Sequence, residues 1–311
     1  NLSNSNWVFE KSSSAIDIIN QGSWEGLDEN MCDRFYERYK DELSDYDAFI
    51  CAFPVSFCLL YEKFNKPIYC VAATRYEIPF YDFCEKWSWF NTKLVRMIDD
   101  GQVVPIANNK YDKFYCEYFT QREWLHIPNI CDYTNAKYSP SQNEHIVVDT
   151  RFHPDFTNCQ GTGLHLKNLG RHDWQQYYNY LSIIHVPYNV SLMSIFEQYT
   201  ANVPLFFPTI EFGKYLGNIP EYHSSETAFM SQLLFSQTFD EKKAEHLSTH
   251  KALLLSDFYD EEWMPFINFY DSTDLGSVIS SVNLEDVSKN MRHFNQQRKD
   301  RIYNLWRKII L

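Results

Sequence analysis

The segment from His185 to Tyr199 combines an expected strand end, a tight loop and a helix start with side chains that could hold a phosphorylated ligand. Asn189 or Ser191 is expected to cap the helix, because short polar side chains accept hydrogen bonds from first-turn amides. The free N–H groups and dipole of such a helix favour an anion, and Ser191 and Ser194 add hydroxyl donors. Glu197, one turn beyond Ser194, could accept hydrogen bonds from ribose or sugar hydroxyls. An ordinary capped helix with a solvent-facing glutamate has the same spacing, so both interpretations stay open.

Two more residues of this segment are assigned to the same ligand-binding group. Tyr188 lies in the loop, and His185 lies near the end of the expected strand. A buried, hydrogen-bonded histidine is the commoner role for a residue within such a strand. Its nearness to the strand end nevertheless keeps His185 as a candidate for the site.

A second polar stretch, Thr74–Glu77, directly follows another expected strand. Arg75 could contact a phosphate or hold a carboxylate. Glu77 could be a general base that deprotonates an acceptor hydroxyl, which requires hydrogen-bond reach of that group. A structural ion pair between Arg75 and Glu77 is equally compatible with the sequence. Asp82 and Glu85 are further candidates for the base.

Arg151 follows the expected strand Ile146–Asp149. An arginine at the carboxyl end of a strand could neutralise the negative charge that develops on a leaving diphosphate. A surface arginine without a catalytic role is the alternative. Arg171 and Lys214 are second choices for the same task.

Apolar runs and helical patterns alternate along the chain and would position these residues. Strands are expected over Tyr46–Phe53, Pro67–Ala73, Val103–Ala107, Trp124–Ile127, His145–Asp149, Ile183–Val186 and Val203–Phe207. Helices are expected over Met31–Leu43, Ser56–Phe64, Trp87–Asp100, Lys110–Phe119, Asp173–Tyr180 and Ser191–Thr200, and Gly161–Gly170 is expected to be a loop. This alternation predicts an α/β protein with two parallel, doubly wound sheets. Ligands of such sheets bind at the carboxyl ends of the strands.

The chain resembles a known family in several short blocks. His185–Pro208, which contains the pattern SxxSxFExYxxNxP, resembles exostosin-like glycosyltransferases, including those of large algal DNA viruses. Thr74–Glu77 and Pro128–Thr134 are similar to other parts of the same pattern, and the resemblance covers roughly residues 45 to 311. It implies a GT-B fold, in which two Rossmann-like domains face each other across a cleft.

The resemblance also implies an activity, namely the transfer of a sugar from a nucleotide carrier to an oligosaccharide or N-glycan acceptor. The transfer would be inverting and independent of metal, with no other cofactor. A UDP-sugar is favoured as donor, UDP-xylose is a specific candidate, and GDP-fucose remains open. The expected domains are an acceptor-side domain over residues 1–138, a nucleotide-sugar-binding domain over residues 139–285 and a C-terminal helix over residues 286–311, whose apolar stripe is interrupted at Arg298.

The composition excludes some classes of function. The net charge of −13 argues against nucleic acid as a partner, because an acidic surface repels phosphate backbones. The eight cysteines form no CxxC pair, and Cys51, Cys58 and Cys70 lie in apolar runs, which predicts buried thiols and a cytoplasmic location. No apolar run approaches the length of a membrane span. The Asp-x-Asp sequence Asp45–Asp47 precedes a strand, so we interpret it as a solvated turn and predict no metal site.

Two other classes of function stay open. The chain could be a non-catalytic carbohydrate- or nucleotide-binding module that keeps the fold but lacks a competent base. It could also be an interaction protein that uses its aromatic residues, which make up 17% of the sequence.

Overall fold

The computed structural model describes residues 18–20, 22–73, 75–80, 83–141, 145–149, 165–167, 172–187, 189–216, 249–271 and 274–311. The described residues form two compact units, and the boundary between the units lies between His126 and Ile127. The predicted boundary after residue 138 lies further along the chain, and the described residues from 286 on belong to the second unit rather than standing alone. Each unit is an α/β body with a parallel sheet, as the alternating pattern predicted.

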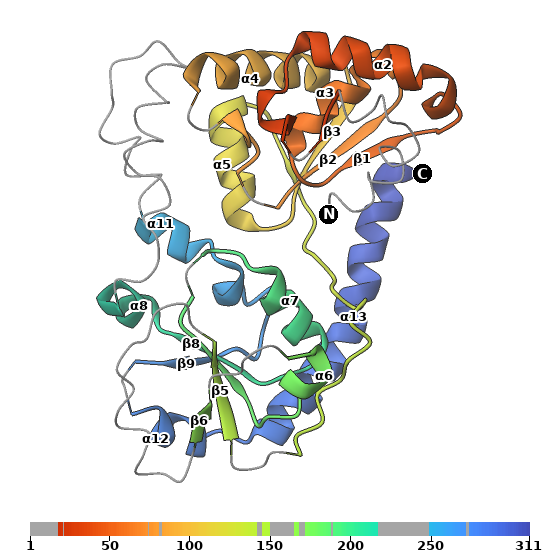
Figure 1. The fold of residues 1–311 in the computed structure, drawn as a ribbon. Helices are drawn as coiled ribbons and strands as arrows, with labels where there is room; N and C mark the ends of the chain where they lie inside the picture. Colours follow the sequence, from red (N-terminus) through yellow and green to blue (C-terminus); the bar gives the residue numbers. More distant parts are fainter. Residues whose placement is uncertain are drawn as a thin grey trace. The chain divides into compact units, whose positions relative to one another are not determined.

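The sheet of the first unit has the order β1-β2-β3-β4 among the described residues, and all its strands are parallel (Figure 1). Its strands are β1 (Phe49–Cys51), β2 (Ile68–Ala72), β3 (Val103–Ala107) and β4 (Leu125–His126). Its helical segments are η2 (Trp24–Gly26), α2 (Glu29–Leu43), η3 (Val55–Phe57), α3 (Cys58–Tyr61), η4 (Glu62–Phe64), α4 (Cys84–Asp99) and α5 (Lys110–Thr120). All five residues of β2 are buried, which suits a central strand covered on both faces.

Aromatic side chains fill the core of the first unit. Trp87, Tyr76 and Trp124 are fully buried, and their indole and phenol groups also form hydrogen bonds. Trp87 Nε1 donates to the Tyr76 hydroxyl over 3.0 Å, and that hydroxyl donates to Asn91 Oδ1 over 2.6 Å. Large buried aromatics with satisfied polar atoms give a core both area and a fixed geometry. Part of the high aromatic content is therefore structural.

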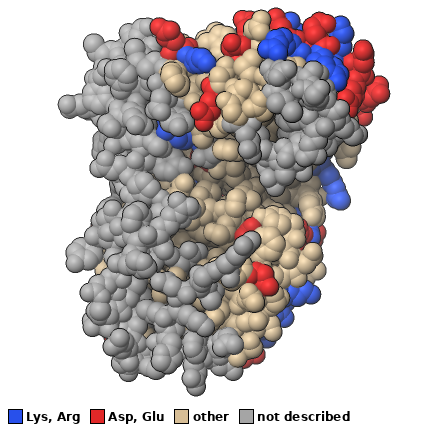
Figure 2. All heavy atoms as spheres, in the orientation of Figure 1, with Lys and Arg blue, Asp and Glu red and all other residues tan. Residues whose placement is uncertain are grey.

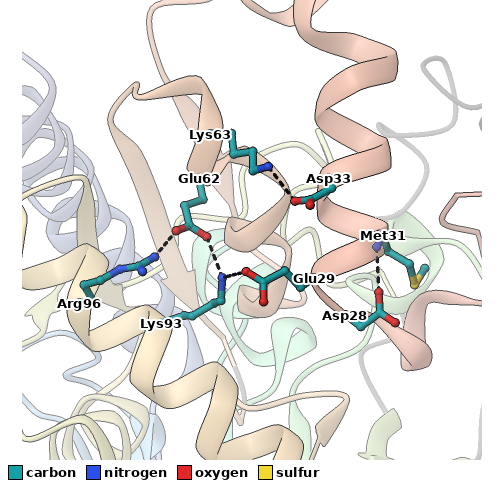
Figure 3. A network of polar contacts seen from close by, with 8 residues as sticks. All are labelled: Asp28, Glu29, Met31, Asp33, Glu62, Lys63, Lys93 and Arg96. Carbon is teal, nitrogen blue, oxygen red and sulfur yellow. Dashed lines mark hydrogen bonds and ion pairs between the residues drawn. The ribbon is translucent and has the colours of Figure 1, made fainter.

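A surface network of charged residues ties α2 to η4 and α4 (Figure 3). Lys93 on α4 lies 2.8 Å from Glu29 on α2 and 3.5 Å from Glu62 on η4, and Glu62 also pairs with Arg96. Lys63 pairs with Asp33 over 2.8 Å. Figure 2 shows acidic and basic side chains gathered together on this part of the surface. The network neutralises its own charges and leaves no free cation for a ligand.

The sheet of the second unit has the order β6-β5-β7-β8-β9 among the described residues, again with parallel strands (Figure 1). The strands are β5 (His145–Asp149), β6 (His165–Lys167), β7 (Ile183–His185), β8 (Leu205–Pro208) and β9 (Asn268–Tyr270). The chain proceeds from β5 to β6 on one side and then crosses to β7 on the other. The strand order therefore reverses between β5 and β7, and such switch points are where open parallel sheets bind ligands.

The helical segments of the second unit are α6 (Trp174–Tyr177), α7 (Met193–Thr200), α8 (Ile210–Leu216), α11 (Thr249–Leu254), η7 (Asp257–Tyr259), α12 (Leu275–Ser280) and α13 (Leu284–Ile310). The long helix α13 packs against α7, and its apolar residues Met291 and Ile302 are buried. Ser288 also points inward and donates to the carbonyl of Asn202 over 2.9 Å. Because α7 carries several predicted site residues, α13 helps to fix their positions.

Two expectations about this unit were wrong. Gly161–Gly170 was expected to be a loop, but residues 165–167 form the edge strand β6, because pairing with β5 overrides the weak local signal. Helix α7 begins at Met193, two residues later than predicted. Arg298 interrupts the apolar stripe of α13 but not the helix, and its side chain is only 3% exposed.

Candidate functional site

The predicted ligand-binding segment lies where the sheet order of the second unit reverses. Asp149, the last residue of β5, pairs with His185, the last residue of β7. The carboxyl ends of β5 and β7 therefore lie next to each other at the same edge of the sheet. Arg151, two residues after β5, and Tyr188, in the loop after β7, lie outside the described residues, so their roles stay predictions.

The start of α7 differs from the prediction in its cap. Leu192 occupies the N-cap position with extended backbone angles, and no side chain caps the helix. Asn189 instead accepts a hydrogen bond from the neighbouring amide of Val190 over 2.7 Å, and the amide of Asp257 donates to the carbonyl of Val190 over 3.2 Å. This contact with a distant segment fixes the loop. The capping roles predicted for Asn189 and Ser191 were therefore wrong.

Glu197 is the centre of a cluster with two aromatic residues. The Trp174 indole N–H donates to Oε2 of Glu197 over 3.1 Å, and the Tyr133 hydroxyl donates to Oε1. The two rings are edge to face at 5.9 Å, and Tyr133 and Trp174 remain 55% and 41% exposed. Burial and the bond to Glu197 raise the pKa of Tyr133, which keeps its hydroxyl a donor.

This cluster retains capacity for a ligand. A carboxylate offers about four lone-pair positions. The contacts with Tyr133 and Trp174 use two of them, so Glu197 can accept further hydrogen bonds from a diol such as ribose. The exposed aromatic rings beside it supply apolar faces on which a nucleobase or a sugar can pack. Glu197 is half-buried and hydrogen-bonded to two neighbours, whereas the alternative interpretation was a solvent-facing glutamate on an ordinary capped helix.

His185 has the structural role that was the alternative interpretation. Its side chain is 1% exposed, its Nε2 lies 2.6 Å from Oε1 of Gln198, and its ring stacks on Phe207 at 4.7 Å. The hydroxyl of Tyr270 donates to the His185 carbonyl over 2.7 Å. These contacts hold the end of β7 against α7 and β9, so His185 acts as a positioning residue.

Ser191 and Ser194 lie beside the start of α7 and are half-buried. Ser194 is in the first turn of α7, and Glu197 follows one turn later, so both side chains lie on the same side of the helix. The prediction that these residues share a region with Glu197 therefore agrees with the helix geometry. A bound ligand at these two hydroxyls stays a prediction.

A buried arginine near the start of α7 was not assigned to a site in the sequence. Arg298 donates through Nη2 to the backbone carbonyl of Asn129 over 2.6 Å, and the side-chain Nδ2 of Asn129 donates over 3.4 Å to the sulfur of Met193, the first residue of α7. Its guanidinium lies 5.6 Å from the centre of the Tyr199 ring. Burial lowers the pKa of Arg298. The only signal for it in the sequence was a charged residue within an apolar helical stripe.

In the first unit, Arg75 and Glu77 follow β2 and form a buried pair. Arg75 Nε donates to Oε1 of Glu77, and the Tyr115 hydroxyl donates to the same oxygen over 2.9 Å. The exposed fraction is 8% for Arg75 and zero for Glu77. Burial raises the pKa of Glu77, while Arg75 and the Tyr115 hydroxyl act in the opposite direction. This geometry is that of the structural ion pair, which was one of the two interpretations of these residues.

More polar residues are buried after β3, at the same edge of the first sheet. Asn109 caps α5 by accepting from the amide of Asp112 over 2.7 Å, and it donates to Oδ2 of Asp112 over 2.6 Å. Asn109 also donates to Oδ1 of Asn108 over 2.8 Å. Burial raises the pKa of Asp112 to about 7. The carboxyl edge of the first sheet is thus polar but closed to solvent at these residues.

Comparisons with known proteins do not identify a family. No protein-family model matches the chain, and no curated protein matches it either. Within the described part of the chain, no three or more His, Cys, Asp or Glu side chains are grouped in a way that could hold a metal ion. None of the described helices combines the length and the apolar character needed to cross a membrane.

Proposed function

We propose that the protein is a glycosyltransferase that uses a nucleotide-sugar donor. The observation that carries the proposal is the cluster of Glu197, Tyr133 and Trp174, because Glu197 lies on α7, the helix that follows β7 at the sheet reversal. Nucleotides bind at such reversals in doubly wound sheets. A carboxylate with free acceptor positions and two exposed aromatic rings matches the hydroxyls and the flat base of a nucleoside.

Each part of the donor has a partner in this proposal. The ribose hydroxyls donate to Glu197, and the base packs on Trp174 or Tyr133. The diphosphate lies at the first-turn amides of α7, where the helix dipole favours negative charge. Arg151, two residues beyond β5, supplies positive charge to the leaving diphosphate.

The finer features of the proposal come from the resemblance to exostosin-like enzymes. They are a GT-B arrangement with a cleft between the domains, an inverting transfer without a metal ion, and an oligosaccharide or N-glycan acceptor. UDP-xylose is the specific donor to test first, and GDP-fucose is the alternative. A reducing compartment such as the cytoplasm is compatible with the buried, free thiols of Cys51, Cys58 and Cys70.

A non-catalytic binding module is the second candidate, and one observation favours it. Glu77, the predicted base, is fully buried and already bonded to Arg75 and Tyr115. A general base must reach the hydroxyl that it deprotonates. If Glu77 keeps this position when ligands bind, the base is another residue or the chain binds a nucleotide sugar without transferring it.

Binding and turnover of a panel of UDP-, GDP- and CMP-sugars, measured without added metal, separate these candidates. Wild-type protein that binds and turns over a UDP-sugar supports the enzyme, whereas tight binding without hydrolysis or transfer supports the module. Glu197→Gln is expected to weaken binding about tenfold or more, and the matched variant Glu261→Gln, at an exposed carboxylate of the same unit, is expected to retain it. Failure of all three nucleotide classes to bind would contradict both candidates.

A further inference from the structure

Two adjoining cavities of the second unit lie away from the start of α7. One has a volume of about 540 Å³ and is lined by residues 132, 134–138 and 200–202 together with Arg292 of α13. The other has a volume of about 520 Å³ and is lined by residues of α13 and by Tyr138, Pro140 and Leu181. Tyr138 and Arg292 line both cavities, so we treat them as one pocket, the α13 pocket. Its size is within the range of small-molecule sites.

The α13 pocket gathers cations that lack a carboxylate partner. Lys137 and Arg292 line the first cavity, and Lys289 lines the second with Arg292. Neither these lysines nor Arg292 forms an ion pair with any residue that the structure describes. Elsewhere in the described chain, many lysines and arginines are paired, among them Lys93 and Arg122.

The acidic residues of the α13 pocket do not cancel this charge. Asp132 lines the first cavity, but it already pairs with Lys299. Glu285 lines the second cavity and forms no ion pair with a described residue. Among the described lining residues, three cations against one uncompensated carboxylate leave a local excess of positive charge in a chain whose net charge is −13. This local reversal of sign favours an anionic ligand.

The walls of the α13 pocket are held in place by hydrogen bonds, and one wall has an unused polar atom. Tyr138 donates to the carbonyl of Leu181 over 2.7 Å, and Ser288 donates to the carbonyl of Asn202 over 2.9 Å. Thr200 Oγ1 is buried and has no hydrogen-bond partner among the described residues, and Thr200 lines the first cavity.

We propose that the α13 pocket binds the phosphate group of a small phosphorylated ligand, at a site separate from the one proposed at the start of α7. A phosphate monoester carries nearly two negative charges near neutral pH, which matches several cations better than a single carboxylate does. Arg292 can hold two phosphate oxygens at once, and Lys137 and Lys289 add point charges. The pocket lies at Thr200–Asn202, at the opposite end of α7 from Met193.

Isothermal titration calorimetry of the full chain with glucose 6-phosphate, inorganic phosphate and glucuronate tests this proposal. We expect both phosphate compounds to bind more tightly than glucuronate. Tighter binding of glucose 6-phosphate than of inorganic phosphate would identify a sugar phosphate as the source of the group. Absence of binding by both phosphate compounds, or tighter binding of glucuronate, overturns the proposal.

Matched variants locate the binding. Arg292→Gln should weaken phosphate binding by at least about tenfold, because a charge-assisted contact is lost. Arg307→Gln makes the same charge change at an exposed position of the same helix and should leave binding unchanged. Equal effects of the two variants would contradict the assignment. Glu197→Gln should retain phosphate binding, so this result is independent of the proposed transferase site.

Discussion

Replacement of Asp112 by Asn should change how the stability of the protein depends on pH. Asp112 is 2% exposed, and its carboxylate accepts a hydrogen bond from Asn109 over 2.6 Å. Burial disfavours the charged carboxylate and raises its pKa from 3.8 to about 7, although the bond from Asn109 acts in the opposite direction. Asn has nearly the same shape, can accept the same hydrogen bond, and does not become charged.

The sign and the size of the effect follow from this pKa. The folded state holds the proton of Asp112 more tightly than the unfolded state, so the stabilising contribution of protonation is complete below about pH 4. This stabilising contribution is lost as the pH rises to about 7, at about 1.4 kcal/mol per pH unit. Above pH 7 the total loss is at most about 4 kcal/mol. Asp112→Asn removes this loss.

Urea unfolding, followed by tryptophan fluorescence between pH 4 and pH 9, measures the difference. The advantage of the variant in the free energy of unfolding should increase between pH 4 and pH 7 and then stay constant. Asp41→Asn, at an exposed residue of α2, is the control for the change in net charge. If the curves for Asp112→Asn and wild type run parallel over this range, the reasoning about buried Asp112 is wrong.

Three further predictions concern other described residues. Glu197→Gln should weaken UDP binding about tenfold or more in a titration, because hydrogen bonds to a charged acceptor are lost. Trp174→Phe should weaken it less. Unchanged affinity in both variants would contradict the proposed nucleoside contacts. Glu62→Gln should lower the free energy of unfolding by about 1 kcal/mol, because Glu62 contacts two cations. Glu37→Gln, which removes an exposed pair with Lys40, should lower it less. Equal effects of the two variants would contradict a stabilising role for the surface network. The thiol of Cys70 should resist labelling at pH 8 in the native protein, because burial raises its pKa, and rapid labelling under native conditions would contradict this.

Strong local patterns allowed much of the fold to be predicted. The strands Val103–Ala107 and His145–Asp149 have the predicted bounds, because buried parallel strands are short, continuous apolar runs. The edge strands β6 and β9 were not predicted, since each has three residues and depends on one neighbour in the sheet for its pairing. Strand pairing over long sequence distances is not visible in a local pattern.

The candidate site was predictable only in part, for a similar reason. Glu197 was singled out as an acceptor for ribose or sugar hydroxyls, which stays a prediction. Its partners Tyr133 and Trp174 could not be found from the sequence, because they come from segments far away along the chain. The pairing of Arg75 with Glu77 could be anticipated from their spacing. Their complete burial could not, because it depends on Tyr115 and on packing within the unit.

The central claim is that a nucleotide binds beside the start of α7, and hydrogen–deuterium exchange of the full chain with and without saturating UDP tests it most directly. The account predicts slower exchange of peptides over residues 189–200 and 129–133 when UDP is present, without added metal. Unchanged exchange in these peptides, while UDP binds elsewhere or not at all, would contradict it.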